Sequence, residues 1–319
     1  MRLIPLLTTA VMLAVTLSAA PVSAADPAPA LTIFEPYGTG SAADRIIDLL
    51  RPSLEKRLGR SLKVEHVGDA ALDKTAAAVP DGNTVVVVAL LPHEIAEATG
   101  KGGTKLSALT PVAKLTGPGS VALVVPDASP IKNWAEFAAA ARARPLSIAS
   151  PGRASAAGVP IAFMERALNV QFKDVVAETH PAILDAMAAK RADAAFVVTV
   201  TLQPGLLGAP PLRPIVTFGA KRAAVLPEVP TFMEAIGPQP GAKQHNAITS
   251  AIALFGPPGM PAATIQKLVE DFTEAASAAK QGGSILASRV PLEVGDAALL
   301  RETMERDKSV IQEVVSLLH

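Results

Sequence analysis

Short apolar runs alternate along the chain with stretches in which apolar residues recur at helical spacing. The runs are rich in Val, Ile and Leu, which is typical of strands buried on both faces of a sheet. Strand and helix in alternation predict an α/β fold in which mainly parallel sheets are flanked by helices. The expected strands are 31–34, 62–67, 85–91, 121–125, 146–149, 194–200, 215–218 and 248–255.

The helical stretches follow the same alternation until the chain nears its end. Clear examples are 133–144 and 182–192, each lying between two expected strands. The last part reads as two longer amphipathic helices, 261–280 and 295–318, without strands of their own. We expect these two helices to pack back on an earlier sheet, and no internal repeat is visible.

The first expected strand ends in the glycine-containing loop EPYGTGSAAD, and an amphipathic helix follows directly. Apolar residues recur every fourth position from Ile46 to Leu58. Ser41 is a candidate N-cap, with Asp44 three residues later as in a capping box. A loop joined to a helix N-terminus presents N–H groups and partial positive charge, so it favours an anion.

A second junction has the same layout. The strand 146–149 ends in SPGRASAAG, and a helix follows. Two such junctions, one in each half of the chain, suggest two lobes that face one cleft, although ordinary capped turns produce the same pattern. Arg153 is a candidate partner for a carboxylate, but a loop arginine is often only solvated.

Composition removes several classes of function. The 29 basic and 29 acidic side chains cancel, which argues against a nucleic-acid or membrane-surface partner. No cysteine is present, so disulfides, thiol catalysis and cysteine metal sites are excluded. Aromatic residues make up 3% of the chain, too few to expect stacking platforms for sugars or bases. We therefore expect no catalytic residues, no metal ligands and no cofactor.

Two enzyme interpretations stay open as alternatives. The stretch GTGSAA at 38–43 satisfies a dinucleotide-binding fingerprint, with Glu65 near the end of the next strand as a candidate ribose ligand. No lysine follows in the pattern of a phosphate-binding loop. A hydrolase would need a nucleophile, but Ser41, Ser150 and Ser155 lack the Gly-x-Ser-x-Gly context.

The first 25 residues have the layout of a cleaved secretory signal peptide. Arg2 precedes a short apolar stretch, and small residues precede a cut after Ala24 or Ala25. The apolar stretch is short for a membrane anchor, which is the alternative. The absence of an Arg-Arg pair favours export of an unfolded chain to the periplasm.

Six stretches, in this order, resemble the Bug-type extracytoplasmic substrate-binding proteins of tripartite tricarboxylate transporters. They are FEPYGTGSAADRIIDLLRPSLEKRLGRSLKVEH, VPDGNTVVV, LTPVAKL, LSIASPGRASAAG, AKRAAVLPEVPTFMEA and LFGPPGMP. The resemblance implies a non-enzymatic, monomeric, two-lobed periplasmic binding protein of the type II-like class. Such a protein closes on a small organic acid and delivers it to membrane permease subunits. Lobe 1 would combine 26–124 with 250–319, lobe 2 would span 125–249, and hinges would lie near 125 and 250.

The resemblance also implies ligand-binding residues in two loops, one in each lobe. The residues in the matching positions are Tyr37, Gly38, Thr39, Gly40, Ser41, Ala42 and Asp44 in the first loop, and Ser150, Gly152, Ala154 and Ser155 in the second. Arg153 in the second loop and Thr199 after a later strand are further candidates, which could supply a positive charge and a hydroxyl group.

Several positions depart from the family pattern. Ser41 replaces the second of two glycines, where a side chain would restrict a positive φ. In the second lobe Pro151 removes an N–H donor, Gly158 stands where the family has His, Glu178 adds negative charge, and Val197 replaces an Asp. The second lobe is thus less suited to an anion, which implies weak binding, a shifted ligand class, or an orphan or signalling receptor.

Overall fold

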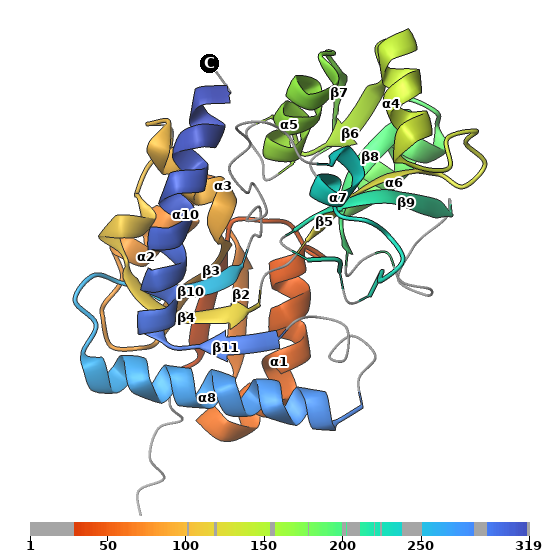
Figure 1. Cartoon of the computed structure of the whole chain (residues 1–319). Coiled ribbons are helices and arrows are strands. Elements are labelled where there is room, and N and C mark those ends of the chain that lie inside the picture. The colour runs from red at the N-terminus through yellow and green to blue at the C-terminus, as the bar shows by residue number, and fades with distance from the viewer. Residues whose placement is uncertain are drawn as a thin grey trace, which may run out of the picture.

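The computed structural model describes residues 29–100, 102–117, 120–153, 157–177, 179–199, 202, 211–219, 221–223, 225–237, 251–283 and 292–317. These residues build two lobes, each with its own sheet and its own covering helices (Figure 1). The expected signal peptide lies outside the described residues. None of the described helices is both long enough and apolar enough to span a bilayer.

The first lobe draws its elements from both ends of the chain. They are β1 (Leu31–Glu35), α1 (Ala42–Leu58), β2 (Leu62–His66), α2 (Ala71–Ala76), β3 (Thr84–Ala89), α3 (Leu90–Ala98), β4 (Thr110–Thr116), β10 (Ile252–Gly256), α8 (Ala262–Gln281), β11 (Leu292–Gly295) and α10 (Ala297–Leu317). The six strands form one sheet in the order β11-β4-β10-β3-β1-β2.

The second lobe is built from the middle of the chain. Its elements are β5 (Val121–Pro126), α4 (Trp134–Ala143), β6 (Ser147–Ser150), α5 (Gly158–Leu168), β7 (Lys173–Val176), α6 (His180–Ala188), β8 (Ala194–Val198), β9 (Leu212–Phe218) and α7 (Phe232–Ile236). The strand order β7-β6-β8-β5-β9 matches the order β2-β1-β3-β10-β4 of the first lobe. The two lobes therefore repeat one topology that the sequence does not reveal as a repeat.

Both sheets are mixed rather than simply parallel, while the two-lobed α/β class is confirmed. β1 pairs in parallel with β2 and β3, and β6 pairs in parallel with β7 and β8. The strands that run against this direction include β5 and β10, by which the chain passes into the other lobe. Because β5 belongs to the second sheet from Val121 onwards, the described chain changes lobe before the boundary expected near 125.

Three strands lie outside the stretches expected from the apolar pattern, namely β4, β7 and β11. β7 has the exposed sequence KDVV at a sheet edge, so it carries little apolar signal. β11 precedes α10 and corrects the expectation that the last two helices bring no strand. The run 85–91 also divides, since β3 ends at Ala89 and α3 begins at Leu90.

Each sheet is covered on both faces, and the expected amphipathic stripe of α1 is buried. Ile46, Leu50 and Leu54 lie in one core cluster with Phe272 of α8, against which α1 packs. The helix stops at Gly59, which has a left-handed φ of 62°.

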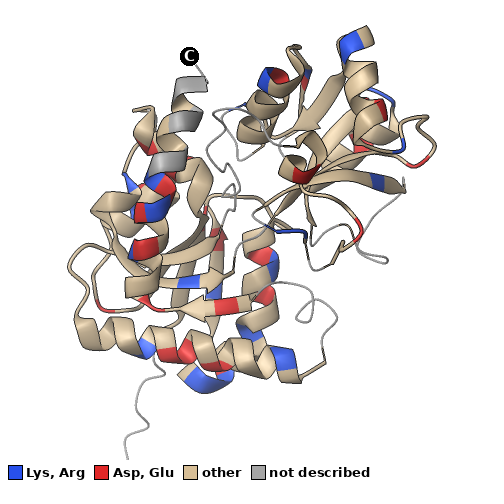
Figure 2. Cartoon of the chain, in the orientation of Figure 1, with Lys and Arg blue, Asp and Glu red and all other residues tan. Residues whose placement is uncertain are grey.

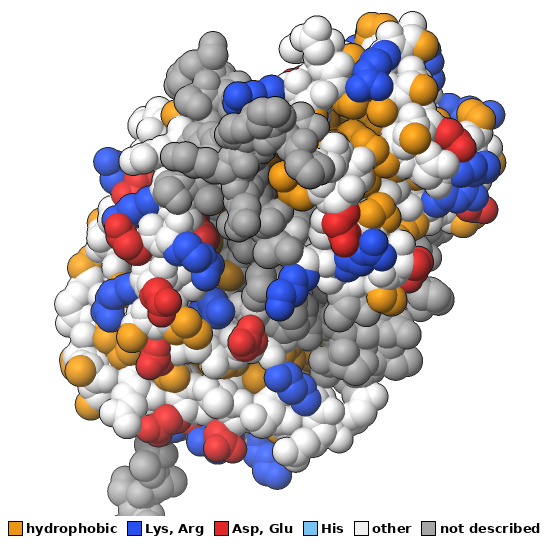
Figure 3. Space-filling model, viewed as in Figure 1, with side chains coloured by type: hydrophobic (Ala, Val, Ile, Leu, Met, Phe, Trp, Pro, Cys, Tyr) orange, Lys and Arg blue, Asp and Glu red, His pale blue; other side chains and the backbone are white. Residues whose placement is uncertain are grey.

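Two first-lobe helices also contact the second lobe. Leu91 and Ile95 of α3 and Ile311 of α10 belong to the core cluster that contains Phe163 of α5. Figure 1 shows α10 extending from the first lobe toward α5. Acidic and basic residues alternate over both lobes in Figure 2, and the space-filling view of that face (Figure 3) shows both signs interspersed on its described residues.

Candidate functional site

The first loop connects β1 to α1 and is tied closely to the first turn of that helix. The Ser41 hydroxyl accepts a hydrogen bond from the Asp44 amide at 3.0 Å, which makes Ser41 the N-cap. Gly40 takes the left-handed conformation with a φ of 82°, whereas Ser41 has a φ of −60°. The serine therefore occupies the position without the backbone strain that its side chain would meet at positive φ.

The Asp44 carboxylate accepts a hydrogen bond from the Gly40 amide at 2.7 Å. Arg45 donates from Nε to the Gly40 carbonyl at 3.1 Å, so both backbone groups of Gly40 are hydrogen-bonded to side chains of α1. Within the described part of the chain, the amides of Gly38 and Thr39 make no hydrogen bond, and they are available to an anion.

Tyr37 turns its hydroxyl away from the loop toward the junction of β3 and α3. The Ala89 amide donates to this hydroxyl at 3.0 Å, and His93 Nε2 lies 3.3 Å from it. Burial raises the pKa of Tyr37, so the hydroxyl stays protonated. These contacts position the loop on the core.

Two residues beneath this loop carry chemistry that the sequence analysis did not assign. Glu35 is fully buried at the end of β1, and burial raises its pKa to about 6. Its Oε1 accepts a hydrogen bond from the Ser41 hydroxyl, and His66 at the end of β2 lies beside it. The sequence does contain a signal for this site, because Glu35 is an acidic residue at the end of the mainly apolar run LTIFE.

The second loop follows β6 and begins at the buried residue Ser150. The Ser150 hydroxyl accepts a hydrogen bond from the Gly152 amide at 3.1 Å, and Gly152 has a φ of 104°. A side chain at Gly158 would place its Cβ 1.8 Å from the Arg153 carbonyl oxygen. The missing side chain at Gly158 is thus required by the path of the loop. Ala154 and Ser155 lie outside the described residues.

The Arg153 guanidinium is bound to two carboxylates of its own lobe. It donates to Glu165 at 2.6 and 2.8 Å and to Asp174 at 2.9 Å. Hydrogen bonding to Glu165 raises the pKa of Arg153. Because Glu165 is only 9% exposed, this pair anchors the loop to α5.

Thr199 lies just after β8 and is 3% exposed. Its hydroxyl is 3.1 Å from the Ser120 hydroxyl, and its amide donates to the Ser120 carbonyl at 2.9 Å. Since Ser120 directly precedes β5, Thr199 joins two strand ends near the passage between the lobes. Val197 is buried in the core of the second lobe, and Glu178 lies outside the described residues.

Arg45 in the first lobe acts electrostatically on His180 in the second lobe, and the sequence analysis assigned neither residue. His180 begins α6, whose N-cap is Thr179. Its Nε2 is buried and makes no hydrogen bond among the described residues. Burial lowers the pKa of His180, and the positive charge of Arg45 lowers it further. Arg45 in the first turn of α1 and His180 in the first turn of α6 are therefore near enough to interact electrostatically.

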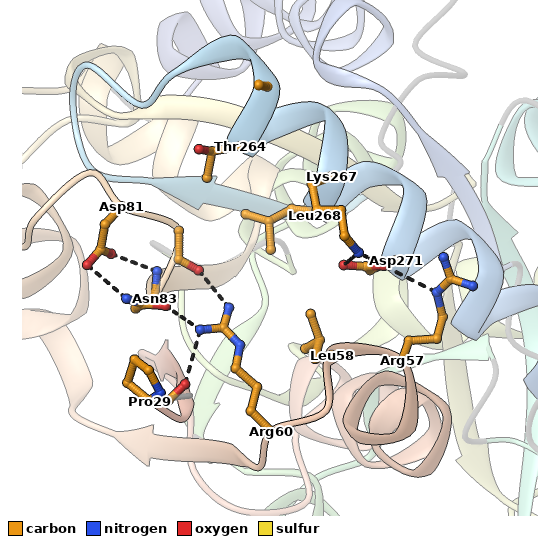
Figure 4. A pocket seen from close by; sticks show the side chains of 12 residues that line it. Pro29, Arg57, Leu58, Arg60, Asp81, Asn83, Thr264, Lys267, Leu268 and Asp271 are labelled. Carbon is orange, nitrogen blue, oxygen red and sulfur yellow. Dashed lines mark hydrogen bonds and ion pairs between the residues drawn. The ribbon is translucent and has the colours of Figure 1, made fainter. Parts of the chain in front are cut away.

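A separate surface pocket of about 580 Å³ lies at the opposite end of α1 (Figure 4). Arg57 and Lys267 both bind the buried carboxylate of Asp271 there. Arg60 donates to carbonyl oxygens of Pro29 and Gly82. These cations already have partners inside the protein, and a helix of 17 residues, roughly 25 Å long, separates the pocket from the first loop.

Comparison with known proteins agrees with this architecture. Residues 50–315 match the tripartite tricarboxylate transporter family receptor. The UPF0065 protein in the gbd 5′ region of Cupriavidus necator is 28% identical over 250 residues, covering 75% of this chain and 72% of that protein.

Two solved structures from Rhodopseudomonas palustris share the fold. MatC with bound malate has a TM-score of 0.70 and 24% identity over 89% of this chain and 99% of that one. Rpa4515 with adipate has a TM-score of 0.76 and 20% identity over 91% and 97%. The chain belongs to the tripartite tricarboxylate transporter receptor family, whose members are periplasmic solute-binding proteins.

Proposed function

We propose that this protein binds a small dicarboxylate between its two lobes, in the periplasm, and delivers it to membrane permease subunits. The observation that supports the proposal is the electrostatic interaction between Arg45 and His180, which belong to opposite lobes and each lie in the first turn of a helix. Two helix N-termini and two nitrogen-bearing side chains complement an anion without any nucleophile. Malate and adipate, bound by two proteins of the same fold, are both dicarboxylates.

The two loops have different parts in this proposal. Gly38 and Thr39 supply amide donors in the first lobe, and Arg45 supplies a positive charge. In the second lobe His180 supplies an N–H donor, which compensates for the contacts that the sequence comparison indicated were lost. Arg153 acts as a positioning residue through Glu165.

Binding would be coupled to closure of the lobes. The chain enters the second lobe between β4 and β5 and returns to the first between α7 and β10, so a change at these two crossings would move one lobe against the other. We propose a monomer, exported by a signal peptide within residues 1–25, in which closure buries the ligand. The closed form is the one that a permease would recognise.

A proton would accompany the ligand. His180 in the free protein has a lowered pKa, but a carboxylate beside it would favour the charged imidazolium and raise that pKa again. Affinity should therefore increase as the pH falls through the raised pKa of the imidazole in the complex. Calorimetry in two buffers of different ionisation enthalpy would show net proton uptake.

Isothermal titration calorimetry with malate, succinate, adipate and citrate tests the function itself. We expect at least one dicarboxylate to bind in the micromolar range, and Arg45→Ala and His180→Gln to weaken it by more than roughly tenfold each, as loss of a charge-assisted hydrogen bond does. Arg142→Ala, which removes an exposed arginine of α4, is the matched control. Binding by the parent that both site variants leave unchanged would refute this location, and no heat with any carboxylate would refute the ligand class.

A further inference from the structure

His66 holds the carbonyl group that lies directly before the two free amides of the first loop. It is the last residue of β2, and its side chain is 29% exposed. Its Nδ1 lies 2.9 Å from the Tyr37 carbonyl oxygen. This oxygen can only accept, so Nδ1 carries the proton and donates it. Among the described residues, His66 is the side chain that binds this carbonyl.

Two carboxylates hold the imidazole ring of His66 in this orientation. Glu35 and His66 are direct neighbours in the parallel pairing of β1 with β2, and Glu35 Oε2 lies 2.5 Å from Nδ1. Asp44 Oδ1 lies 3.4 Å from Nε2. The ring is therefore held at both nitrogens, and it keeps Nδ1 directed at the loop.

The carbonyl that His66 binds belongs to the same peptide unit as the Gly38 N–H. A peptide unit is planar and, before a residue other than proline, trans, so its C=O and N–H groups point in opposite directions. A Tyr37 carbonyl that points at His66 therefore directs the Gly38 N–H away from β2. Gly38 is exposed, and a Cβ built on it would meet nothing within 4 Å. A ligand can therefore approach this part of the loop closely.

The neighbouring amide of Thr39 is fixed in a different way, so His66 has an effect that can be separated. The Gly38 carbonyl accepts a hydrogen bond from the Ser41 amide at 3.1 Å. By the same peptide geometry, this backbone contact fixes the direction of the Thr39 N–H. Of the two free amides, only that of Gly38 therefore depends on the side chain of His66.

We propose that His66 is a positioning residue for the ligand, because it orients the Gly38 N–H toward the carboxylate that the first loop binds. This inference rests on the proposed function, which supplies the carboxylate. A donor that is already oriented loses less freedom on binding, and this raises affinity. Because glycine accepts φ of either sign, the peptide between Tyr37 and Gly38 could turn over without His66 and present its carbonyl oxygen to the anion.

Substitution of His66 by the two amide side chains separates its ring nitrogens. The side-chain nitrogen of asparagine stands at the same distance along the side chain as Nδ1, and that of glutamine corresponds to Nε2. His66→Asn therefore keeps a donor for the Tyr37 carbonyl, whereas His66→Gln offers its donor on the side of Asp44. His66→Leu removes both donors and keeps an apolar side chain of moderate size.

Isothermal titration calorimetry with malate, succinate and adipate compares these variants with the parent. For the ligand that the parent binds most tightly, we expect His66→Leu and His66→Gln to weaken binding by at least roughly fivefold, as loss of a hydrogen bond does, and His66→Asn to stay within about twofold of the parent. Lys63→Gln, an exposed change on the same strand, is the matched control. In the ligand-free parent, nitrogen NMR of the histidine rings should show His66 Nδ1 protonated at neutral pH, and His66→Leu identifies this signal by its loss.

Three results would overturn the role of His66 and leave the proposed function standing. They are parental affinity in His66→Leu, an equal loss of affinity in His66→Asn and His66→Gln, and an Nδ1 without a proton. Failure of the parent to bind any of the dicarboxylates would instead refute the proposed function, and this role with it. Circular dichroism verifies that the variants fold, and the comparison of His66→Asn with His66→Gln carries the test if His66→Leu does not fold.

Discussion

The buried carboxyl group of Glu94 should make the stability of the protein strongly dependent on pH. Glu94 lies on α3 and is 8% exposed, and one of its oxygens makes no hydrogen bond among the described residues. Burial, followed by the negative charges of Asp307 on α10 and of Glu97, raises its pKa from 4.5 to about 8. The folded protein therefore holds a proton that the unfolded chain releases above about pH 4.5.

The sign and size of the effect follow from this difference. Because the folded pKa is raised, the native state loses stability as the pH rises from about 4.5 to about 8, and the full penalty applies above that range. At 1.36 kcal/mol for each pH unit, the penalty is about 3 kcal/mol at pH 7. Glu94→Gln keeps the shape of the neutral side chain and cannot ionise, so it should remove this penalty.

Urea unfolding followed by circular dichroism at pH 4.5 and pH 7 measures the prediction. We expect Glu94→Gln to match the parent at the lower pH and to be more stable by about 3 kcal/mol at the higher one. Glu305→Gln, on the exposed side of α10, should stay within about 0.5 kcal/mol at both values. A difference between Glu94→Gln and the parent that is the same at both pH values would refute the reasoning.

Three further changes test the loops. Ser41→Ala removes the N-cap of α1 and should destabilise the protein by about 1 kcal/mol in urea unfolding. Arg153→Met leaves the buried carboxylate of Glu165 without its ionic partner and should lower the free energy of unfolding by about 3 kcal/mol. The double variant Arg153→Met, Glu165→Met should regain most of this stability, and equal losses in the single and double variants would contradict the pairing. Gly158→Ala places a Cβ 1.8 Å from a carbonyl oxygen and should lower the melting temperature, whereas Gly38→Ala, with nothing within 4 Å, should not.

Local features of the fold could be predicted because they depend on residues that lie close together in the sequence. The loop before α1, its cap at Ser41 and its stop at Gly59 follow from residues that are neighbours in sequence. Buried strands such as β3 and β5 are continuous apolar runs. The edge strand β7 was missed because it faces solvent and lacks such a run.

The mixed direction of the sheets could not be predicted in the same way. Strand alternation indicates which segments are strands, but the direction of a strand depends on where the chain enters the sheet. β5 and β10 enter from the other lobe, and each is therefore antiparallel to its neighbours. Long-range topology of this kind is decided by packing of elements far apart in the chain.

The charge distribution of the candidate site could not be predicted from the sequence either. The sequence analysis interpreted Glu178 and Val197 as changes that disfavour anion binding in the second lobe, because it considered each position separately from its neighbours in space. Arg45 and His180 are separated in the chain by three of the six strands of the first sheet and three of the five strands of the second, yet the charge of one acts on the other. A binding cleft is formed by strand ends and helix N-termini of both lobes. Its net charge therefore depends on which side chains the fold brings together, and positions read one at a time do not give it.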